Sequence, residues 1–141
     1  FAPGREALSS YRLRDQVAPV VDLSMVARDP DGILGGAIRY WPIVVGCHNA
    51  LLLGPVAVHP TRQGEGLGGA LIRDSLALAA RQGWRRALLV GDAPYYRRYG
   101  FEKLNDVVMP PPTNPDRVLG LSIIPDAWLG VCGPVQSTRD R

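Results

Sequence analysis

The sequence predicts a mixed α/β fold, in which antiparallel strands come before a strand–helix–strand crossover. Three observations support this. Turn-punctuated, alternating segments fill residues 21–58, the hydrophobic period becomes helical over 66–82, and a short apolar run follows at 86–90. A helix between two strands carries the chain back across a sheet, so these segments are expected to form one central crossover.

The first half is expected to form an antiparallel meander after a short helix over residues 7–19, which Pro19 would end. The strands are predicted over residues 21–28, 33–46 and 50–58. A hairpin turn at Asp29–Gly32 joins the first two, because Pro30 and Gly32 suit the φ angles of a turn. His48-Asn49 is predicted to be the second turn.

Proline positions predict irregularities in two of these strands. Proline has no N–H to donate to a ladder, so the second strand is expected to break near Pro42 and the third to bulge at Gly54-Pro55.

The second half is expected to alternate helices with short strands. In the helix over 66–82 the predicted buried stripe consists of Ile72, Leu76, Ala79 and Ala80, with Gly83 as the stop. Asp92 is predicted to cap a helix over 93–99, which ends at Gly100. A strand over 101–104, a proline-rich loop over 109–116 and one or two strands within 117–135 complete the chain.

Composition limits the classes of protein. The 141 residues, 15.3 kDa, fit one domain over residues 1–141, and 46% hydrophobic residues exclude a disordered chain. No apolar run approaches the roughly 20 residues of a membrane helix, and a net charge of +3 without a basic block does not indicate nucleic acid.

Cysteine and histidine are sparse. Cys47 and Cys132 are too few for a disulfide framework and have no metal-ligand spacing, so no metal is predicted. Cys132 is expected to be a small core residue. The chain opens without a signal-peptide core, which makes the cytoplasm the expected compartment, and without Met, which suggests that it is trimmed at its N-terminus.

The most informative stretch runs from Val56 to Leu71, where a strand leads through a glycine-rich loop into a long helix. The first N–H groups of a helix lack partners and carry partial positive charge. Glycines allow close approach of a ligand to these groups, so a phosphate or diphosphate is the expected occupant.

Two known phosphate motifs compete for this loop. A P-loop needs Lys-Ser/Thr after its last glycine, which Gly69-Ala70 does not supply. Residues 64–69 match the dinucleotide pattern G-x-G-x-x-G, with Asp92 as a candidate ribose acid. The dinucleotide pattern would indicate a nucleotide-binding oxidoreductase. Two observations argue against this function: residues 59–63 separate the loop from its strand, and little βαβ sequence follows Asp92.

Three motifs, in one order, resemble the GNAT-type N-acetyltransferase family. Gln63-x-x-Gly66-x-Gly68 is similar to its acetyl-CoA signature, Q/R-x-x-G-x-G/A, and Val56-Ala57-Val58-x-Pro60 resembles its cofactor strand. Tyr96–Phe101 resembles its Y-x-x-x-G-F segment. The resemblance covers roughly residues 21–104.

The resemblance implies a mostly antiparallel sheet, splayed at the cofactor strand and flanked by helices. It implies acetyl-CoA as co-substrate, with the pyrophosphate on the amides of the glycine loop and the pantetheine arm along Val56–Val58. The implied cofactor-binding residues are Val56, Ala57, Val58, Gln63, Gly64, Gly66, Leu67, Gly68 and Gly69. The family's opening strand has no counterpart, because only about twenty residues, which read as helix, precede Val21.

The implied activity is direct transfer of an acetyl group to a primary amine, on a small molecule or a peptide, in a ternary complex. By motif position Tyr96 is the catalytic acid that returns a proton to the CoA thiolate. Tyr95 and Tyr99 are expected to be packing residues, and no residue is assigned as general base. A CoA-binding module without turnover is the alternative, and a homodimer is a mild expectation.

Overall fold

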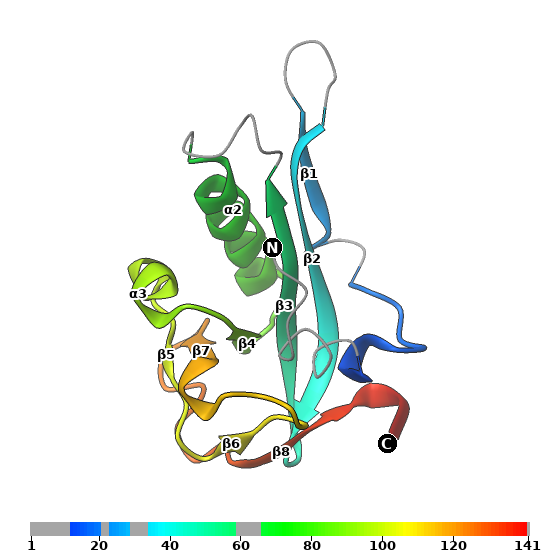
Figure 1. Ribbon diagram of the computed structural model, residues 1–141, viewed down its shortest axis with the longest axis vertical. Helices are drawn as coiled ribbons and strands as arrows, with labels where there is room; N and C mark the ends of the chain where they lie inside the picture. Colours follow the sequence, from blue (N-terminus) through cyan, green and yellow to red (C-terminus); the bar gives the residue numbers. More distant parts are fainter. Residues whose placement is uncertain (1–11, 21–22, 29–33, 59–65, 141) are drawn as a thin grey trace.

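The computed structural model describes residues 12–20, 23–28, 34–58 and 66–140. Their strands form one eight-stranded sheet in the order β5-β7-β4-β3-β2-β8-β6, with β1 beside β2 (Figure 1). The elements are β1 (Met25–Arg28), β2 (Leu34–Val45), β3 (His48–Val58), α2 (Leu67–Arg81), β4 (Arg86–Val90), α3 (Ala93–Tyr96), η3 (Arg97–Tyr99), β5 (Glu102–Lys103), β6 (Val107–Val108), η4 (Pro115–Arg117), β7 (Val118–Ser122), β8 (Gly133–Ser137) and η5 (Thr138–Asp140).

Strands β1, β2 and β3 form the predicted antiparallel meander. The turn between β2 and β3 lies at Gly46-Cys47, with Gly46 at φ 60°, so the prediction of a turn at His48-Asn49 is wrong by two residues. Glycine adopts this φ without the steric cost that other residues meet, which explains why the chain reverses there. The predicted turn at Asp29–Gly32 lies outside the described residues.

Strand β2 runs unbroken through Pro42, contrary to prediction. Pro42 pairs with Leu51 of β3, while the opposite edge of β2 pairs with β1 only up to Ile38 and with β8 only from Ile43. Pro42 therefore lies between two partners, where a missing N–H removes no ladder hydrogen bond.

The N-terminal elements are shorter than predicted. The described helix covers residues 12–14 and ends well before Pro19, and Gln16 has φ 59°. A residue in the left-handed region cannot continue a right-handed helix. Strand β1 begins at Met25 rather than at residue 21, and before it the Leu23 N–H donates to the Val20 carbonyl, 3.1 Å.

The predicted crossover is confirmed, because β3 and β4 are parallel and α2 connects them. Helix α2 runs alongside β3 on one face of the sheet (Figure 1). Its buried residues are Gly69, Leu71, Ile72, Ser75 and Ala79. Ala80 is exposed, so the predicted stripe is wrong at that position. Ser75 is polar, but its hydroxyl hydrogen-bonds the buried Tyr40 hydroxyl (2.8 Å) and the Leu71 carbonyl (2.7 Å).

Two hydrophobic clusters cover the two faces of the sheet. The first, on the α2 face, includes Tyr40, Leu53, Ile72, Leu89 and Phe101. The second, on the other face, includes Leu13, Ile43, Leu52, Leu88 and Val118. Leu52 and Leu53, and likewise Leu88 and Leu89, point to opposite clusters because side chains alternate along a strand.

The C-terminal strands β7 and β8 add to the sheet on either side of the β2–β3–β4 centre. Strand β7 pairs with β4, and β8 pairs with β2 from Ile43↔Ser137 to Val45↔Val135. Cys132, just before β8, is exposed, so its predicted place in the core is wrong. No helix in the described ranges is long and apolar enough to cross a bilayer.

Candidate functional site

The parallel strands β3 and β4 separate in the middle of the sheet. Their recorded pairs are Leu51↔Ala87 and Leu52↔Leu88, whereas β3 continues to Val58. Within the described sheet no strand pairs with the β4-facing edge of β3 beyond Leu52. The end of β3 therefore presents backbone N–H and C=O groups to a gap, as an extended ligand requires for strand addition.

The bulge predicted at Gly54-Pro55 is confirmed at the start of this gap. Ile38 of β2 pairs with Val56 and Tyr40 pairs with Leu53, which leaves one residue of β2 opposite two of β3. Gly54 has φ 145°, and a β-carbon there would meet nothing within 4 Å. A bulge bends its strand, so it provides a local reason for β3 to turn away from β4.

Helix α2, which follows β3 in the chain, begins at Leu67. Gly66 is its N-cap at φ 76° and carries no side-chain cap, and the Ala70 N–H donates to the Gly66 carbonyl, 3.0 Å. The N–H groups of Leu67, Gly68 and Gly69 precede this bond and so have no partner within the helix. These three residues are members of the diphosphate site that the sequence predicts, and that site stays a prediction. Gln63 and Gly64, two further predicted members, lie outside the described residues.

Tyr96 lies on α3, directly after β4 and next to Gly91. A β-carbon at Gly91 would stand 2.7 Å from a ring carbon of Tyr96, so the ring occupies the space that a side chain would need. The Tyr96 ring also meets the rings of Tyr95 (centroids 4.9 Å apart) and Phe101 (6.0 Å). These contacts fix the ring, and the part of the chain that the structure describes offers its hydroxyl no hydrogen-bond partner.

Burial raises the pKa of Tyr96 above the ordinary 10.0, and the neighbouring Tyr99 raises it further, while Arg117 opposes the shift. A phenol with a raised pKa keeps its proton at neutral pH. Tyr96 is therefore in the state that can donate a proton.

A tyrosine pair joins α3 to the start of α2. The Tyr95 and Tyr99 hydroxyls are 3.3 Å apart, and this hydrogen bond, followed by burial, raises the pKa of Tyr95 to about 12. The Tyr99 hydroxyl lies 2.6 Å from where a β-carbon of Gly69 would stand. The predicted packing role of both tyrosines is thus seen in the structure, and Gly69 allows the start of α2 to meet Tyr99 of η3.

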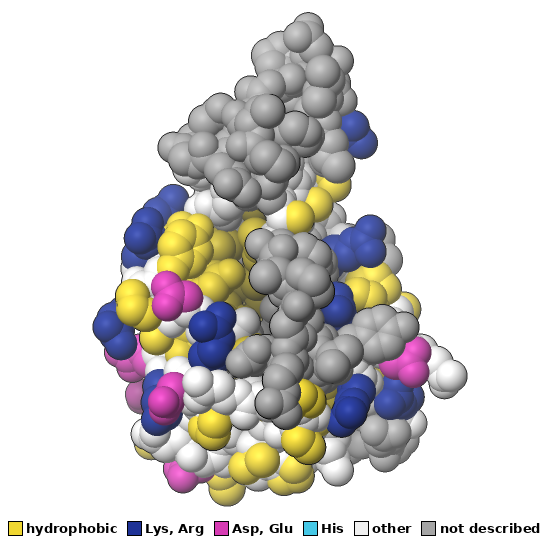
Figure 2. Space-filling view, in the orientation of Figure 1, with side chains coloured by type: hydrophobic (Ala, Val, Ile, Leu, Met, Phe, Trp, Pro, Cys, Tyr) yellow, Lys and Arg dark blue, Asp and Glu magenta, His cyan; other side chains and the backbone are white. Residues whose placement is uncertain are grey.

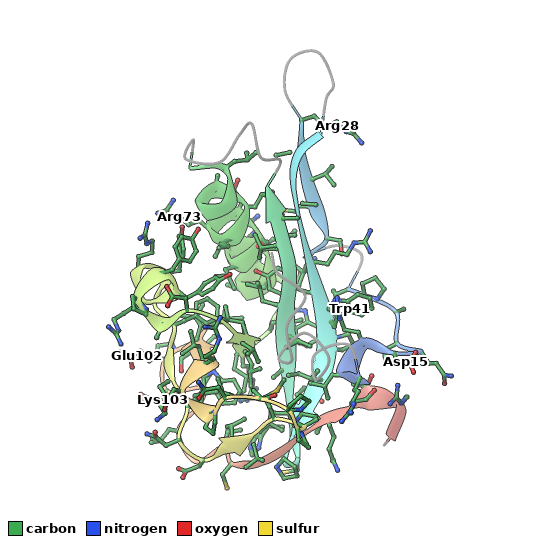
Figure 3. The ribbon with its side chains drawn as sticks, viewed as in Figure 1. Asp15, Arg28, Trp41, Arg73, Glu102 and Lys103 are labelled. Carbon is green, nitrogen blue, oxygen red and sulfur yellow. The ribbon has the colours of Figure 1, made fainter. Side chains whose placement is uncertain are left out.

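Two arginines cover the outer faces of this pair. The Arg73 guanidinium is 5.1 Å from the Tyr99 ring centroid, and that of Arg98 is 4.7 Å from the Tyr95 centroid. Figure 3 labels Arg73 beside α2, and Figure 2 shows hydrophobic side chains over this region with Lys and Arg at its margin. The helix start is thus bordered by positive charge.

Asp92 is the N-cap residue of α3, as predicted, but its side chain makes no capping hydrogen bond. Its backbone is extended, and its carbonyl accepts from the Tyr96 N–H, 3.0 Å. The position was therefore right and the capping interaction wrong.

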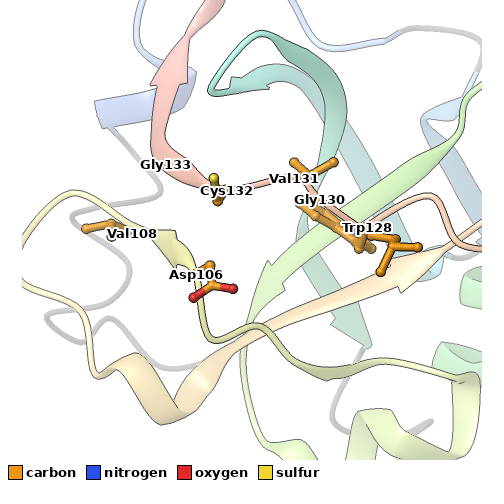
Figure 4. A pocket seen from close by; sticks show the side chains of 8 residues that line it. Asp106, Val108, Trp128, Gly130, Val131, Cys132 and Gly133 are labelled. Atoms are coloured by element: carbon orange, nitrogen blue, oxygen red, sulfur yellow. The ribbon is translucent and has the colours of Figure 1, made fainter.

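Val56 and Tyr96, two of the predicted site residues, both pack against the first core cluster. Sequence reasoning missed Gly91 and Gly69 as contact positions, since a glycine that admits a distant ring looks like any turn or helix glycine. A separate pocket of about 610 Å³, lined by Asp106, Val108 and residues 128–133, contains none of the predicted site residues (Figure 4).

These features define an acyltransferase-like fold with a splayed strand and a glycine-rich helix start. A family model described as the acetyltransferase (GNAT) domain matches residues 22–103, more than half of the chain. The chain belongs to this family.

Two curated relatives are proteins of Escherichia coli K12. The uncharacterized N-acetyltransferase YhbS is 30% identical over 104 residues, which cover 72% of this chain and 61% of YhbS. The uncharacterized N-acetyltransferase YjhQ is 43% identical over 51 residues, 36% of this chain and 28% of YjhQ. The chain thus matches less than two thirds of the length of either relative.

Two solved structures share the fold and contain CoA ligands. The crystal structure of Escherichia coli YhbS in complex with CoA has a TM-score of 0.74 and 26% identity, over 96% of this chain and 78% of that one. A GNAT family acetyltransferase from Brucella melitensis in complex with acetyl-CoA has a TM-score of 0.64 and 37% identity, over 80% and 64%. The mixed α/β fold with a mostly antiparallel sheet is confirmed.

Proposed function

We propose that this protein transfers an acetyl group directly from acetyl-CoA to a primary amine, in a ternary complex of the protein, acetyl-CoA and the amine. The observation that carries the proposal is the open edge of β3 beyond Leu52, beside the start of α2. One extended ligand with an anionic end fits both features. The complexes of the two solved relatives with CoA and acetyl-CoA support the same ligand.

Acetyl-CoA is proposed to bind with its pyrophosphate at the start of α2. The N–H groups of Leu67, Gly68 and Gly69 would donate to it, with Gly66 turning the chain and Gln63 and Gly64 contributing by their place in the motif. The pantetheine arm would pair with Val56, Ala57 and Val58. Ala57 is exposed and Val56 half-buried, which supports access to this part of β3.

The reaction forms a C–N bond and breaks the C–S bond of the thioester. The neutral amine attacks the carbonyl carbon, whose oxygen takes up negative charge, and CoA leaves as a thiolate with a pKa near that of a simple thiol, about 8.5. Tyr96 is proposed to give its proton to this thiolate. The proton that the amine nitrogen loses returns to the Tyr96 oxygen, so the products are the amide, the CoA thiol and protonated Tyr96. Because its pKa is raised, Tyr96 is protonated at neutral pH and has a proton to give.

The acceptor is proposed to be a small molecule or a peptide that carries a primary amine. No general base is assigned, so an amine with a low pKa, or one deprotonated through water, is the expected acceptor. We propose further that residues 1–141 form a single acetyltransferase-like domain, which the continuous eight-stranded sheet supports.

Ligand-dependent melting tests the binding step. Acetyl-CoA is expected to raise the melting temperature and NAD⁺ is not, because only a ligand of the folded state stabilises it. A rise with NAD⁺ alone would favour the dinucleotide reading of residues 64–69 and contradict the proposal.

Release of free CoA thiol with a panel of primary amines tests the transfer step. Amine-dependent release is expected. Binding of acetyl-CoA without release across small-molecule and peptide amines would instead favour a non-catalytic CoA-binding module.

A further inference from the structure

A side-chain hydrogen bond crosses the bulge near which β3 separates from β4. The indole Nε1–H of Trp41, on β2, donates to the Gly54 carbonyl at 2.7 Å. In a regular strand a carbonyl lies in the plane of the sheet and accepts from the neighbouring backbone. Here the carbonyl is held by a side chain instead, at the residue with φ 145°.

The bond lies where the two parallel strands separate. The last recorded pair between them, Leu52↔Leu88, comes two residues before Gly54, and β4 continues to Val90 paired with β7 on its other side. The departure from parallel pairing therefore coincides with the bulge on β3 and not with an end of β4.

Trp41 is itself held in place. It packs against the second core cluster, on the face away from α2, and the Arg14 guanidinium lies 5.7 Å from its ring centroid. Figure 3 labels Trp41 beside β2 on the side away from α2. An indole held by these contacts can keep its hydrogen bond to the Gly54 carbonyl without help from a ligand.

We propose that Trp41 is a positioning residue for acetyl-CoA: its hydrogen bond to Gly54 holds the bulge that keeps the edge of β3 open for the pantetheine arm. This inference rests on the proposed function. Trp41 acts through the backbone of β3 and has no assigned contact with the reacting atoms. Its loss should affect the pantetheine arm and spare the diphosphate at the start of α2.

The test compares two Trp→Phe variants. Trp41→Phe removes the Nε1–H and keeps an aromatic ring. Trp128→Phe is the matched control, because Trp128 packs against the same cluster and its Nε1–H donates to the Leu121 carbonyl, 3.0 Å, away from the gap. Both variants lose one neutral hydrogen bond, so both should melt at similarly lowered temperatures.

Two ligands separate a positioning role from a purely structural one. Trp41→Phe is expected to raise the Kd for acetyl-CoA about tenfold, a size that one hydrogen bond can account for. Its Kd for 3′-phospho-ADP, which lacks the pantetheine arm, should stay within about twofold. Trp128→Phe should leave both Kd values near wild type.

The inference is overturned if Trp41→Phe and Trp128→Phe bind acetyl-CoA equally, or if Trp41→Phe loses both ligands in the same proportion. Wild-type protein that binds no acetyl-CoA would overturn the proposed function itself. If Trp41→Phe does not fold, benzothienylalanine at position 41 keeps the indole shape without the N–H, and the same outcomes apply.

Discussion

The ring of Tyr96 fills the space in which a side chain of residue 91 would stand. Gly91 directly follows β4, and its N–H donates to the Arg117 carbonyl at 2.9 Å, so the backbone beneath the ring is tied to the sheet. The proposed acid is therefore positioned by the central sheet and by its aromatic neighbours, and substitutions at either residue give measurable consequences.

Tyr96→Phe should lower kcat by about 10²-fold or more, because it removes the proton donor and preserves the ring contacts. The Kd for acetyl-CoA should not change. Steady-state kinetics and calorimetry measure the two quantities. Tyr95→Phe is the control, since its hydroxyl bonds Tyr99 instead and its loss should leave kcat within about twofold. An unchanged kcat in Tyr96→Phe would remove Tyr96 from the mechanism.

The pH dependence of kcat should reflect the raised pKa of Tyr96. The protonated phenol is the active form, so the rate should hold at neutral pH and fall as pH rises through a pKa above 10.0. The residual activity of Tyr96→Phe should lack this alkaline decline. Circular dichroism over the same range separates it from unfolding, and a decline that survives in the Phe variant would assign it to another group.

Gly91→Ala should lower kcat by more than about tenfold, because its methyl group displaces the Tyr96 ring. In a Tyr96→Ala background the same substitution should have little further effect, since the obstructing ring is gone. A double-mutant cycle of kcat measures this coupling. Equal losses in both backgrounds would show that Gly91 acts on something other than Tyr96.

The effect of Gly69→Ala on the free energy of unfolding should depend on which residue stands at position 99. In wild type the added β-carbon meets the Tyr99 hydroxyl at 2.6 Å and should destabilise the fold. Tyr99→Phe removes that oxygen, and the helix preference for alanine over glycine should then stabilise by about 0.5–1 kcal/mol. Urea denaturation of the four proteins gives the values. Destabilisation of the same size in both backgrounds would contradict this contact.

Ser75→Ala should destabilise more than Tyr40→Phe. The Tyr40 hydroxyl is buried and bonds Ser75, whereas the Ser75 hydroxyl also reaches the Leu71 carbonyl. Ser75→Ala leaves the buried Tyr40 hydroxyl without a hydrogen-bond partner, which costs about 1–3 kcal/mol of stability. Tyr40→Phe removes only one net hydrogen bond, which costs about 1 kcal/mol. Denaturation midpoints rank the variants, and the reverse order would mean that Tyr40 has another partner.

Helix α2 and strand β4 of the crossover could be predicted from sequence to within a residue because their signals are local. The helical period and the glycines at 66 and 83 delimit α2, and a short apolar run marks β4. The break predicted at Pro42 failed for a nonlocal reason, since its cost depends on which strand lies on the other edge of β2.

The candidate site likewise contains residues that the sequence could locate and contacts that it could not. The motifs located Gly66 and Tyr96, because they record residue types at fixed spacing. The contact of Tyr96 with Gly91 and the bond from Trp41 to Gly54 depend on how the folded chain packs in three dimensions. A residue's own sequence neighbourhood contains no trace of either.

One edge of strand β2 pairs with β1 along its first part and with β8 along its last part, and β8 comes much later in the chain. During synthesis, a nascent chain that has emerged only through α3 already has both hairpin partners and the crossover, yet Ile43–Val45 still lacks its cover. Such an uncovered edge can pair with strands of other chains. Aggregation during translation is thus a hazard that ends only when β8 docks.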